Sequence, residues 1–253
     1  MDISYLHKEA HETVRGARRV LIVAHKKPDG DTLGAATAMF NYCKAKGIPA
    51  TGFCHDIVPQ QYMYIPGTEE FTADPAVFAD PSHDVMAVFD AGDLRFAGIA
   101  DLVDSMPVRP TIVNFDHHAT NERFGTVNVV DVKASSTAEV VYDFLQTVGM
   151  EIDRDIATCL LTGIITDTGS FSNPATTDSA LGAASDLVRR GAKMQEVSSK
   201  LMRNKSLMSL RLWGQVLARL KYNEKLGVAS TAIFAKDLEV EGVDDEHVEG
   251  ISN

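Results

Sequence analysis

Three short runs of apolar and β-branched residues each end in charged or imidazole side chains. They are residues 19–25 (RRVLIVAH), 84–90 (DVMAVFD) and 111–116 (TIVNFD), and a weaker run covers residues 48–54. Continuous apolar runs of this length are typical of strands that are buried on both faces of a sheet. Because helical patterns separate the runs, the sequence predicts an α/β fold: a mostly parallel sheet with helices on both faces.

The spacing of apolar residues predicts the helices between and after these strands. For the first helix, Asp31 or Thr32 is the expected N-cap and Gly47 the end. Further along the chain, an amphipathic helix carrying Trp213 is expected before a strand that starts near Leu226. The expected helices cover residues 32–46, 135–148, 152–165, 177–190 and 205–222.

The change in character after residue 193 predicts the domain organisation. We expect a catalytic domain over residues 1–192, a helical linker over 193–222 and the incomplete start of a C-terminal substrate-binding domain of α/β type over 223–253. The acidic tail 240–253 supplies no element that would close a fold, and domains without staples need about 40 residues or more. The expectation is therefore a chain that stops inside its second domain, with activity confined to small substrates.

Composition excludes several classes of protein. The formal net charge of −11 disfavours binding to long duplex nucleic acid, which needs a basic stripe to neutralise phosphates. No apolar run is long enough to span a membrane and the first ten residues are polar, so we expect a cytoplasmic protein that binds no membrane. Cys43, Cys54 and Cys159 are odd in number and far apart, which argues against a disulfide framework or a thiolate zinc site and favours buried thiols.

The chemistry-bearing residues follow the predicted strands. The segment His25–Asp31 (HKKPDGD) follows the first strand, Asp90 ends another, Asp116-His117-His118 ends a third, and Asp167 ends the apolar helix predicted over 152–165. Ligands bind at the carboxyl ends of parallel strands, so these segments should converge in one crevice. Taken alone, PDGD would be a turn that caps a helix, and DHH a surface loop or a buried, hydrogen-bonded histidine.

Together, the four carboxylates Asp29, Asp31, Asp90 and Asp167 would repel one another in such a crevice unless cations neutralised them. Two divalent ions would supply that charge. A ligand set rich in oxygen with a few imidazoles suits Mn²⁺ first, with Mg²⁺ or Co²⁺, or Fe²⁺, as alternatives. A metal pair generates hydroxide near neutral pH and binds both oxygens of a phosphoryl transfer, which indicates hydrolysis of a phosphate ester.

The motifs HKKPDGD, VFDAGD, NFDHH and GIITDTGSFS, in this order, resemble the four motifs of the DHH phosphoesterase superfamily. The resemblance runs from about Val20 to Gly191. The tail, with DEHVEGISN, is similar to the start of the DHH-associated C-terminal domain of oligoribonucleases that also act as phosphatases on 3′-phosphoadenosine 5′-phosphate. The resemblance therefore implies an enzyme that hydrolyses short oligoribonucleotides or this small nucleotide.

The resemblance also implies a role for each matched residue. Asp90 would bridge the two metals, His118 would contact the phosphoryl group or assist the leaving oxygen, and Asp116 would orient an imidazole. Lys27 stands where the family usually has Asn, at a position that is not a ligand. The ligands would be His25, Asp29 and Asp90 for one metal, and Asp31, Asp90, His117 and Asp167 for the other.

Two further features have a structural interpretation and a functional one. Arg123 would contact a substrate phosphate through its planar fork, or it is simply a solvated surface side chain. Ser135-Ser136-Thr137, with Glu139 following, favours an N-cap cluster, and phosphate binding at that helix N-terminus is the alternative.

Other functions fit the same motifs. Within the family they are a cyclic-dinucleotide phosphodiesterase, a single-strand exonuclease, which the net charge disfavours, and an inorganic pyrophosphatase, which the C-terminal resemblance disfavours. Outside enzymology, the alternative is a nucleotide-binding protein that keeps the fold. Apolar residues within 200–212 would either form a homodimer interface or pack within the chain.

Overall fold

The computed structural model describes residues 3–202 and 207–238, in two compact units, Met1–Lys200 and Leu201–Asn253. The first unit contains a six-stranded sheet in which every neighbouring pair of strands is parallel, so the predicted α/β class is confirmed. The strands are β1 (Val20–Ala24), β2 (Ala50–Cys54), β3 (Phe71–Thr72), β4 (Val85–Phe89), β5 (Thr111–Asp116) and β6 (Val127–Val130).

The strand order of this sheet is β3-β2-β1-β4-β5-β6. The chain moves outward from β1 to β3, returns to place β4 beside β1, and then moves outward again to β6. The boundary between β1 and β4 is therefore a topological switch point, where the loops that leave neighbouring strands diverge and open a crevice. All residues of β1 and β4 are buried, as the apolar runs predicted.

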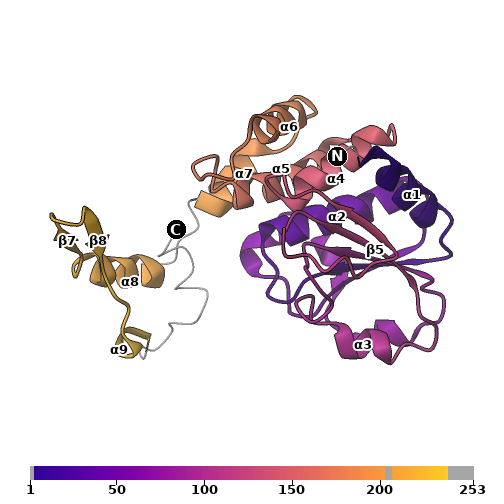
Figure 1. Ribbon diagram of the computed structural model, residues 1–253, viewed down its shortest axis with the longest axis horizontal. Helices are drawn as coiled ribbons and strands as arrows, with labels where there is room; N and C mark the ends of the chain where they lie inside the picture. The colour runs from indigo at the N-terminus through magenta and orange to yellow at the C-terminus, as the bar shows by residue number, and fades with distance from the viewer. Residues whose placement is uncertain (1–2, 203–206, 239–253) are drawn as a thin grey trace. The chain divides into compact units, whose positions relative to one another are not determined.

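Helices cover both faces of the sheet, as Figure 1 shows. On one face lie α1 (Ser4–Arg15), α2 (Gly30–Ala45), α4 (Thr137–Thr147) and α5 (Arg154–Asp167), and α6 (Asp178–Arg189) packs against α4 and α5. Short elements cover the other face: α3 (Ala100–Asp104) and the 3₁₀ turn η3 (Pro75–Ala79), which contact each other. The 3₁₀ turns η1 (Gln60–Tyr62) and η2 (Thr68–Glu70) flank a segment that contacts α2 and α5, where Asn41 Nδ2 donates to the Pro66 carbonyl and Tyr64 Oη lies 3.2 Å from Thr162 Oγ1. Helix α7 (Met194–Met202) follows α6 along the chain.

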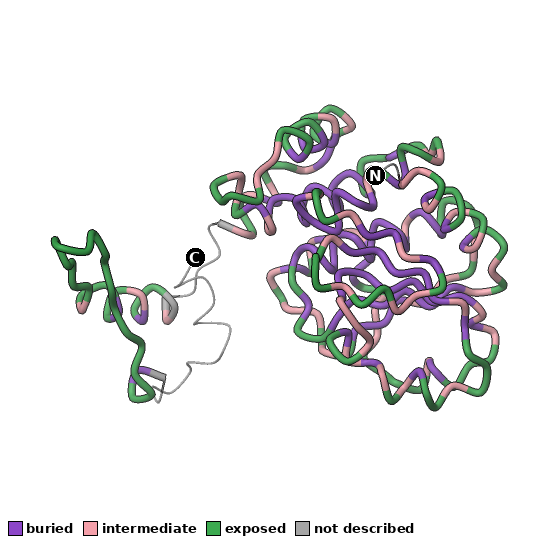
Figure 2. The backbone as a smooth tube through the Cα atoms, in the orientation of Figure 1, coloured by how far each residue is buried: buried purple, intermediate pink, exposed green. Residues whose placement is uncertain are grey.

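Two glycines let α5 pack unusually close to α2 and α4. A Cβ atom on Gly34 of α2 would lie 2.5 Å from the Cys159 carbonyl oxygen of α5. A Cβ atom on Gly163 would lie 2.4 Å from the Cβ of Ala138 and 2.6 Å from Asp31 Oδ1. The close approach brings the N-terminal turn of α2 to the last turns of α5, and both helices are buried along most of their length (Figure 2).

The predicted start of α2 is wrong by two residues. Its N-cap is Asp29, whose Oδ1 accepts hydrogen bonds from the backbone N–H groups of Asp31 and Thr32, each at 3.0 Å. Three aspartate or threonine residues lie within four positions of one another here, and each can cap a helix. Their order along the chain does not show which one has the extended backbone of an N-cap.

Several elements were not predicted, among them α1, β3 and β6. Strands β3 and β6 are two and four residues long, too short for a pattern of alternation to develop. Helix α1 is amphipathic and buries only His7, Ala10 and Val14 among the residues of its inner face. The three cysteines are buried and unpaired, as predicted.

In the second unit, α8 (Leu207–Leu217) is shorter than the helix predicted over 205–222, because residues 221–223 form a strand instead. This strand, β7 (Lys221–Asn223), pairs antiparallel with β8 (Val228–Ser230), which is shorter than the strand expected from Leu226. Helix α9 (Ala235–Leu238) follows, and Arg219 Nη2 donates to Asp237 Oδ1 at 2.7 Å. Residues 203–206 and 239–253 of the predicted linker and second domain lie outside the described residues.

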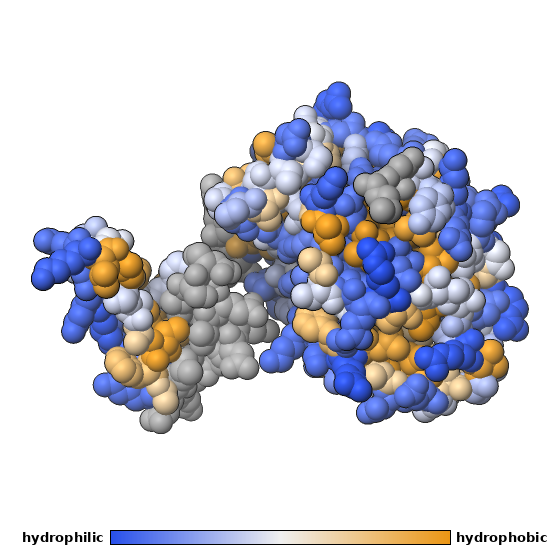
Figure 3. Space-filling view, viewed as in Figure 1, coloured by the Kyte–Doolittle hydropathy of each residue, from blue (hydrophilic) through white to orange (hydrophobic). Residues whose placement is uncertain are grey.

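Apolar side chains, drawn orange in Figure 3, gather on the surface of this second unit. Leu217 and Leu226 are 58% and 73% exposed. Within the part of the chain that the structure describes, no helix combines the length and the apolar character needed to cross a membrane.

Candidate metal centre

The predicted site residues meet at the carboxyl ends of three neighbouring strands. His25 directly follows β1, Asp90 directly follows β4, and Asp116 is the last residue of β5. Asp167, the last residue of α5, reaches the same place from the helical layer. Three groups of side chains have ligand atoms within 4.8 Å of one another: His25, Asp29 and Asp90; Asp31, His117 and Asp167; and Asp90, His117 and His118.

The backbone around this cluster adopts left-handed conformations that are rare for residues other than glycine. Lys27 and Asp90 have φ values of 52° and 58°, and Ser170 and Phe171, just beyond Asp167, have φ values of 58° and 63°. The N–H of Asp90 donates to the carbonyl of Phe115 at 2.9 Å, which fixes the Asp90 backbone against β5. Strain of this kind persists only where the surrounding structure determines it, and it concentrates at functional sites.

Two imidazoles are oriented so that one ring nitrogen is left for a ligand. His25 Nδ1 lies 2.7 Å from the carbonyl oxygen of Lys26, and His117 Nδ1 lies 3.4 Å from that of Ala134. Because a carbonyl oxygen only accepts, each Nδ1 carries the hydrogen and each neutral ring keeps its lone pair on Nε2. A hydrogen-bond acceptor for Nδ1–H is the usual arrangement for a histidine that binds a metal through Nε2.

The free Nε2 atoms face carboxylates. His25 Nε2 lies 3.4 Å from Asp90 Oδ2, and His117 Nε2 lies 3.2 Å from Asp167 Oδ2 and 3.8 Å from Asp90 Oδ1. Among the described residues, the buried His117 Nε2 has no hydrogen-bond partner. A buried nitrogen lone pair directed at carboxylate oxygens is the donor arrangement that a divalent cation completes, so the residues present fit a metal ion.

Asp31 is fully buried and is held by the N-terminus of α4. Its Oδ2 accepts from the N–H of Thr137 at 2.7 Å, and its Oδ1 accepts from the N–H of Ala138 at 2.8 Å. Ser136 caps the same helix by accepting from the N–H of Glu139, so the predicted N-cap cluster is confirmed. The alternative of phosphate binding at this helix end is not favoured, because its first two N–H groups already bind Asp31.

The cluster concentrates negative charge. Burial, together with the charges of Asp167 and Asp90, raises the pKa of Asp31 well above its usual value. Burial and the Asp90 charge raise the pKa of Asp29 to about 6. Burial also opposes the charge of Asp90, but the hydrogen bond and charge of His25 and the charge of His117 outweigh it and lower the pKa. Of these three carboxylates, Asp90 is thus the one most firmly kept in its charged form.

His118 is positioned by Asp116. Asp116 is fully buried, and its Oδ1 accepts from His118 Nδ1 at 2.8 Å and from the backbone N–H groups of His117 and His118. This hydrogen bond raises the pKa of His118 to about 9, against the opposing effect of burial. The half-exposed His118 ring therefore carries a proton over the neutral range, as a group that binds or protonates a phosphate oxygen requires.

Three supporting contacts were not predicted from the sequence, which named Thr32 and Thr137 only as candidate helix caps and did not name Asn121. Asn121 Nδ2 donates to Asp116 Oδ2 at 2.5 Å, and Thr137 Oγ1 donates to Asp90 Oδ1 at 2.8 Å. Thr32 Oγ1 accepts from the N–H of His25 and donates to the carbonyl of Phe89, each at 3.2 Å, which joins β1 to β4. Single polar residues of this kind give no sequence pattern, because their partners lie far along the chain.

Arg123 lies on an exposed loop with φ 54°, and its backbone N–H donates to Asn121 Oδ1 at 2.7 Å. In the described part of the chain, its guanidinium group takes part in no hydrogen bond or ion pair. A phosphate contact by Arg123 stays a prediction.

Comparisons with known proteins identify a family and a fold. The model of the DHH family, N-terminal domain, matches residues 19–164. The chain is 33% identical over 229 residues to the bifunctional oligoribonuclease and PAP phosphatase NrnA of Thermus thermophilus, covering 90% of this chain and 67% of that protein. It is 24% identical to a probable manganese-dependent inorganic pyrophosphatase of Streptococcus mutans, covering 73% and 60% of the two chains. In fold, it is similar to an exopolyphosphatase-related protein from Bacteroides fragilis, with a TM-score of 0.88, 21% identity, and 98% and 74% of the chains covered.

Proposed function

The chain belongs to the DHH family, and from this premise we propose that it is a metal-dependent phosphoesterase that hydrolyses short oligoribonucleotides and 3′-phosphoadenosine 5′-phosphate. The observation that carries the proposal is the convergence of four aspartates and two free imidazole nitrogens at one switch point of the sheet. The name of the Thermus relative, an oligoribonuclease and PAP phosphatase, supports this choice of substrates.

Two divalent ions, with Mn²⁺ first and Mg²⁺ or Co²⁺ as alternatives, are the proposed cofactors. The manganese dependence named for the pyrophosphatase relative supports this metal, as does the mixture of carboxylate oxygens and imidazoles. When bound, such a pair lowers the pKa of a water and neutralises the charge of the phosphoryl oxygens. The residues that would hold one ion are His25, Asp29 and Asp90, and those that would hold the other are Asp31, Asp90, His117 and Asp167.

The side chains outside this ligand set have their own tasks. His118, kept protonated by Asp116, would donate a hydrogen bond to a phosphoryl oxygen and a proton to the leaving oxygen. Thr137 would hold Asp90 in place through its hydroxyl group, and the α4 N–H groups would do the same for Asp31. These contacts preorganise the charged groups before any substrate binds.

The overall charge supports a short substrate. With a net charge of −11, the chain would repel a long polyanion, whereas a dinucleotide or a small bisphosphorylated nucleotide presents few phosphates outside the metal centre. We further propose that residues 1–192 are the catalytic domain, 193–222 a helical linker and 223–253 part of a substrate-binding domain. The division into compact units after Lys200 supports a boundary in this region.

A substrate panel tests the proposal. Dinucleotide, 3′-phosphoadenosine 5′-phosphate, cyclic dinucleotide and pyrophosphate are incubated with the protein in Mn²⁺ and in chelator, and the released nucleotide or phosphate is measured. We expect turnover of the first two in Mn²⁺ and none in chelator. Preferred cleavage of cyclic dinucleotide or pyrophosphate would assign the site to another activity of the family. Turnover that persists in chelator would contradict a metal-dependent mechanism.

A further inference from the structure

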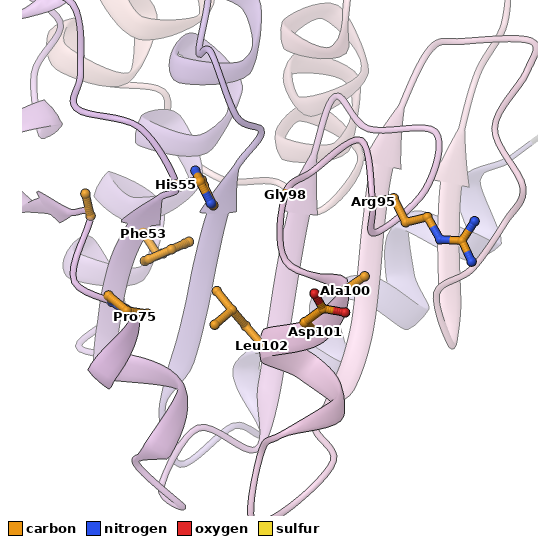
Figure 4. A pocket seen from close by; sticks show the side chains of 9 residues that line it. Phe53, His55, Pro75, Arg95, Gly98, Ala100, Asp101 and Leu102 are labelled. Carbon is orange, nitrogen blue, oxygen red and sulfur yellow. The ribbon is translucent and has the colours of Figure 1, made fainter.

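A cavity of about 610 Å³ lies beside the metal centre, and none of the residues assigned above lines it. It is formed where β2 ends, and its far wall is α3 (Figure 4). Phe53, Pro75 and Leu102 give it apolar walls. His55 and Asp101 add polar groups at its edge. Volumes of about 300–1,000 Å³ are typical of small-ligand sites.

The cavity is one strand away from the metal ligands. In the parallel pairing of β1 with β2, Ala24 lies opposite Cys54, so His25 and His55 are the next residues of two adjacent strands. Adjacent strands lie about 4.8 Å apart. His25 belongs to the metal centre and His55 lines the cavity. A ligand with a phosphate group at the metal centre would therefore reach the cavity through a linker about as long as one sugar.

Gly98 lets the segment that carries the proposed metal ligand His25 lie close to His55 of the cavity. A Cβ atom at this position would lie 3.1 Å from Lys26 Cβ and 3.3 Å from His55 Cβ, and the φ of 80° also favours glycine. The residue before it is tied to the first metal-binding segment, because the N–H of Lys26 donates to the carbonyl of Ala97 at 3.2 Å. The exposed Lys26 side chain thus begins between cavity and cluster, where it would attract a phosphate.

We propose that this cavity binds the nucleobase of the nucleotide whose phosphate group lies at the metal centre; the inference rests on the proposed function and names a subsite for its substrate. A nucleobase is flat and apolar on its faces and carries donors and acceptors at its edge. The apolar walls suit the faces, and the Asp101 carboxylate and the His55 imidazole suit the edge. The guanidinium of Arg95, although this residue lines the cavity, points away from Phe53 and Leu102 in Figure 4, so it leaves the space open.

Phe96 is the rival place for a base. Its side chain is 49% exposed, and its ring packs against that of His25 with the ring centroids 5.3 Å apart. Exposed aromatic rings stack on nucleobases in many single-strand binding sites. Phe96 does not line the cavity, so a substitution at this residue separates the two locations.

The test fills the cavity from its exposed rim. Ala73 lines the cavity and is exposed, so Ala73→Trp would occupy the space of the base without disturbing the core. Ala76→Trp is the matched control, because Ala76 is also exposed, three residues further on, and does not line the cavity. The kcat/KM for a dinucleotide is compared with that for the same dinucleotide lacking one base, the position of the missing base being varied. We expect Ala73→Trp to lower kcat/KM roughly 10- to 100-fold for the intact dinucleotide and to leave the value for one base-free form nearly unchanged.

A binding measurement keeps this inference separate from the proposed function. Calorimetry with adenosine 5′-monophosphate and ribose 5-phosphate, in Mn²⁺, needs no turnover. Weaker binding of the nucleotide alone in Ala73→Trp would support the cavity even if every substrate of the panel failed. An equal loss of affinity for both ligands in Ala73→Trp would overturn the proposal. So would an affinity of Ala73→Trp for the nucleotide equal to that of Ala76→Trp. Selective loss in Phe96→Ala without loss in Ala73→Trp would also overturn it, because the base would then lie on Phe96.

Discussion

At the scale of single residues, His118, which follows the proposed metal ligand His117, is controlled by one buried carboxylate. Asp116 accepts three hydrogen bonds through Oδ1, from His118 Nδ1 and from the N–H groups of His117 and His118, and a fourth through Oδ2 from Asn121. The sequence placed Asp116 correctly because it lies next to the two histidines. Asn121 was missed, since nothing in a loop sequence shows which side chain turns back toward the strand end.

The variant Asp116→Asn tests this control. An amide cannot stabilise the His118 cation as a carboxylate does, so the pKa of His118 should fall from about 9 toward the ordinary value of 6.5. If the protonated ring is the active form, activity should decline at a lower pH than in the wild type, and kcat should fall roughly 10- to 100-fold. NMR titration of His118 and a pH–rate profile measure the two effects. The control is Asp178→Asn at the exposed start of α6, and an unchanged alkaline limb in Asp116→Asn would contradict the assigned role.

At the scale of elements, the site depends on how closely α2 and α5 approach each other. The apolar spacing predicted both helices, but it could not predict their contact, because a glycine in a helix has no pattern until its neighbour is known. Gly34 and Gly163 face atoms at distances that exclude any Cβ atom, whereas Gly182 of α6 has no atom within 4 Å of the position that a Cβ would take. The same residue type therefore has opposite consequences in two helices.

We predict that Gly34→Ala destabilises the protein by about 1–3 kcal/mol, because α5 must move away from α2. Gly182→Ala should stabilise it by up to about 1 kcal/mol, because alanine is the better helix former at an open position. Denaturant unfolding at fixed pH measures both values. Equal effects of the two variants would show that the close approach of α2 and α5 is not needed. Metal affinity should also weaken in Gly34→Ala alone, since Asp31 lies on the displaced turn.

At the scale of the whole molecule, the α/β class followed from the sequence because three apolar runs with charged or imidazole residues at their ends define parallel strands whose carboxyl ends meet in one crevice. The order of the outer strands did not follow, since β3 and β6 are short and pair only at the sheet edges. The helix expected over residues 205–222 ends early because a contact with a later segment of the chain, which no local pattern shows, decides the conformation of its last residues. Residues of β7 fit a helical pattern, but their pairing with β8 decides their conformation.

Charge at the metal centre should make the stability of the metal-free protein depend on pH. The pKa values of His118, raised to about 9, and of His25 and His117 are all higher than the ordinary 6.5, so the folded state binds these protons more tightly than the unfolded state. Their stabilising contribution is complete below pH 6.5 and is lost as pH rises toward 9. We expect the Tm in chelator to fall over this window.

Manganese should reverse that loss. A divalent cation binds the carboxylates and the deprotonated imidazoles of the folded state, so the rise in Tm on adding Mn²⁺ should be larger at pH 8 than at pH 6. Thermal unfolding with and without Mn²⁺ at the two pH values gives the comparison, and His118→Asn shows how much of the loss in chelator comes from this one ring. A Tm that is constant with pH in chelator would contradict the described charge balance.

The most direct test of the central claim is the number of manganese ions that each chain binds. Calorimetric titration, checked by elemental analysis after dialysis, compares the wild type with Asp90→Asn. We predict two ions per chain in the wild type and a loss of both, or at least a roughly 100-fold weaker affinity, in the variant, because Asp90 is the one residue that the two proposed ligand sets share. Two ions bound with unchanged affinity by Asp90→Asn, or no ion bound by the wild type, would contradict it.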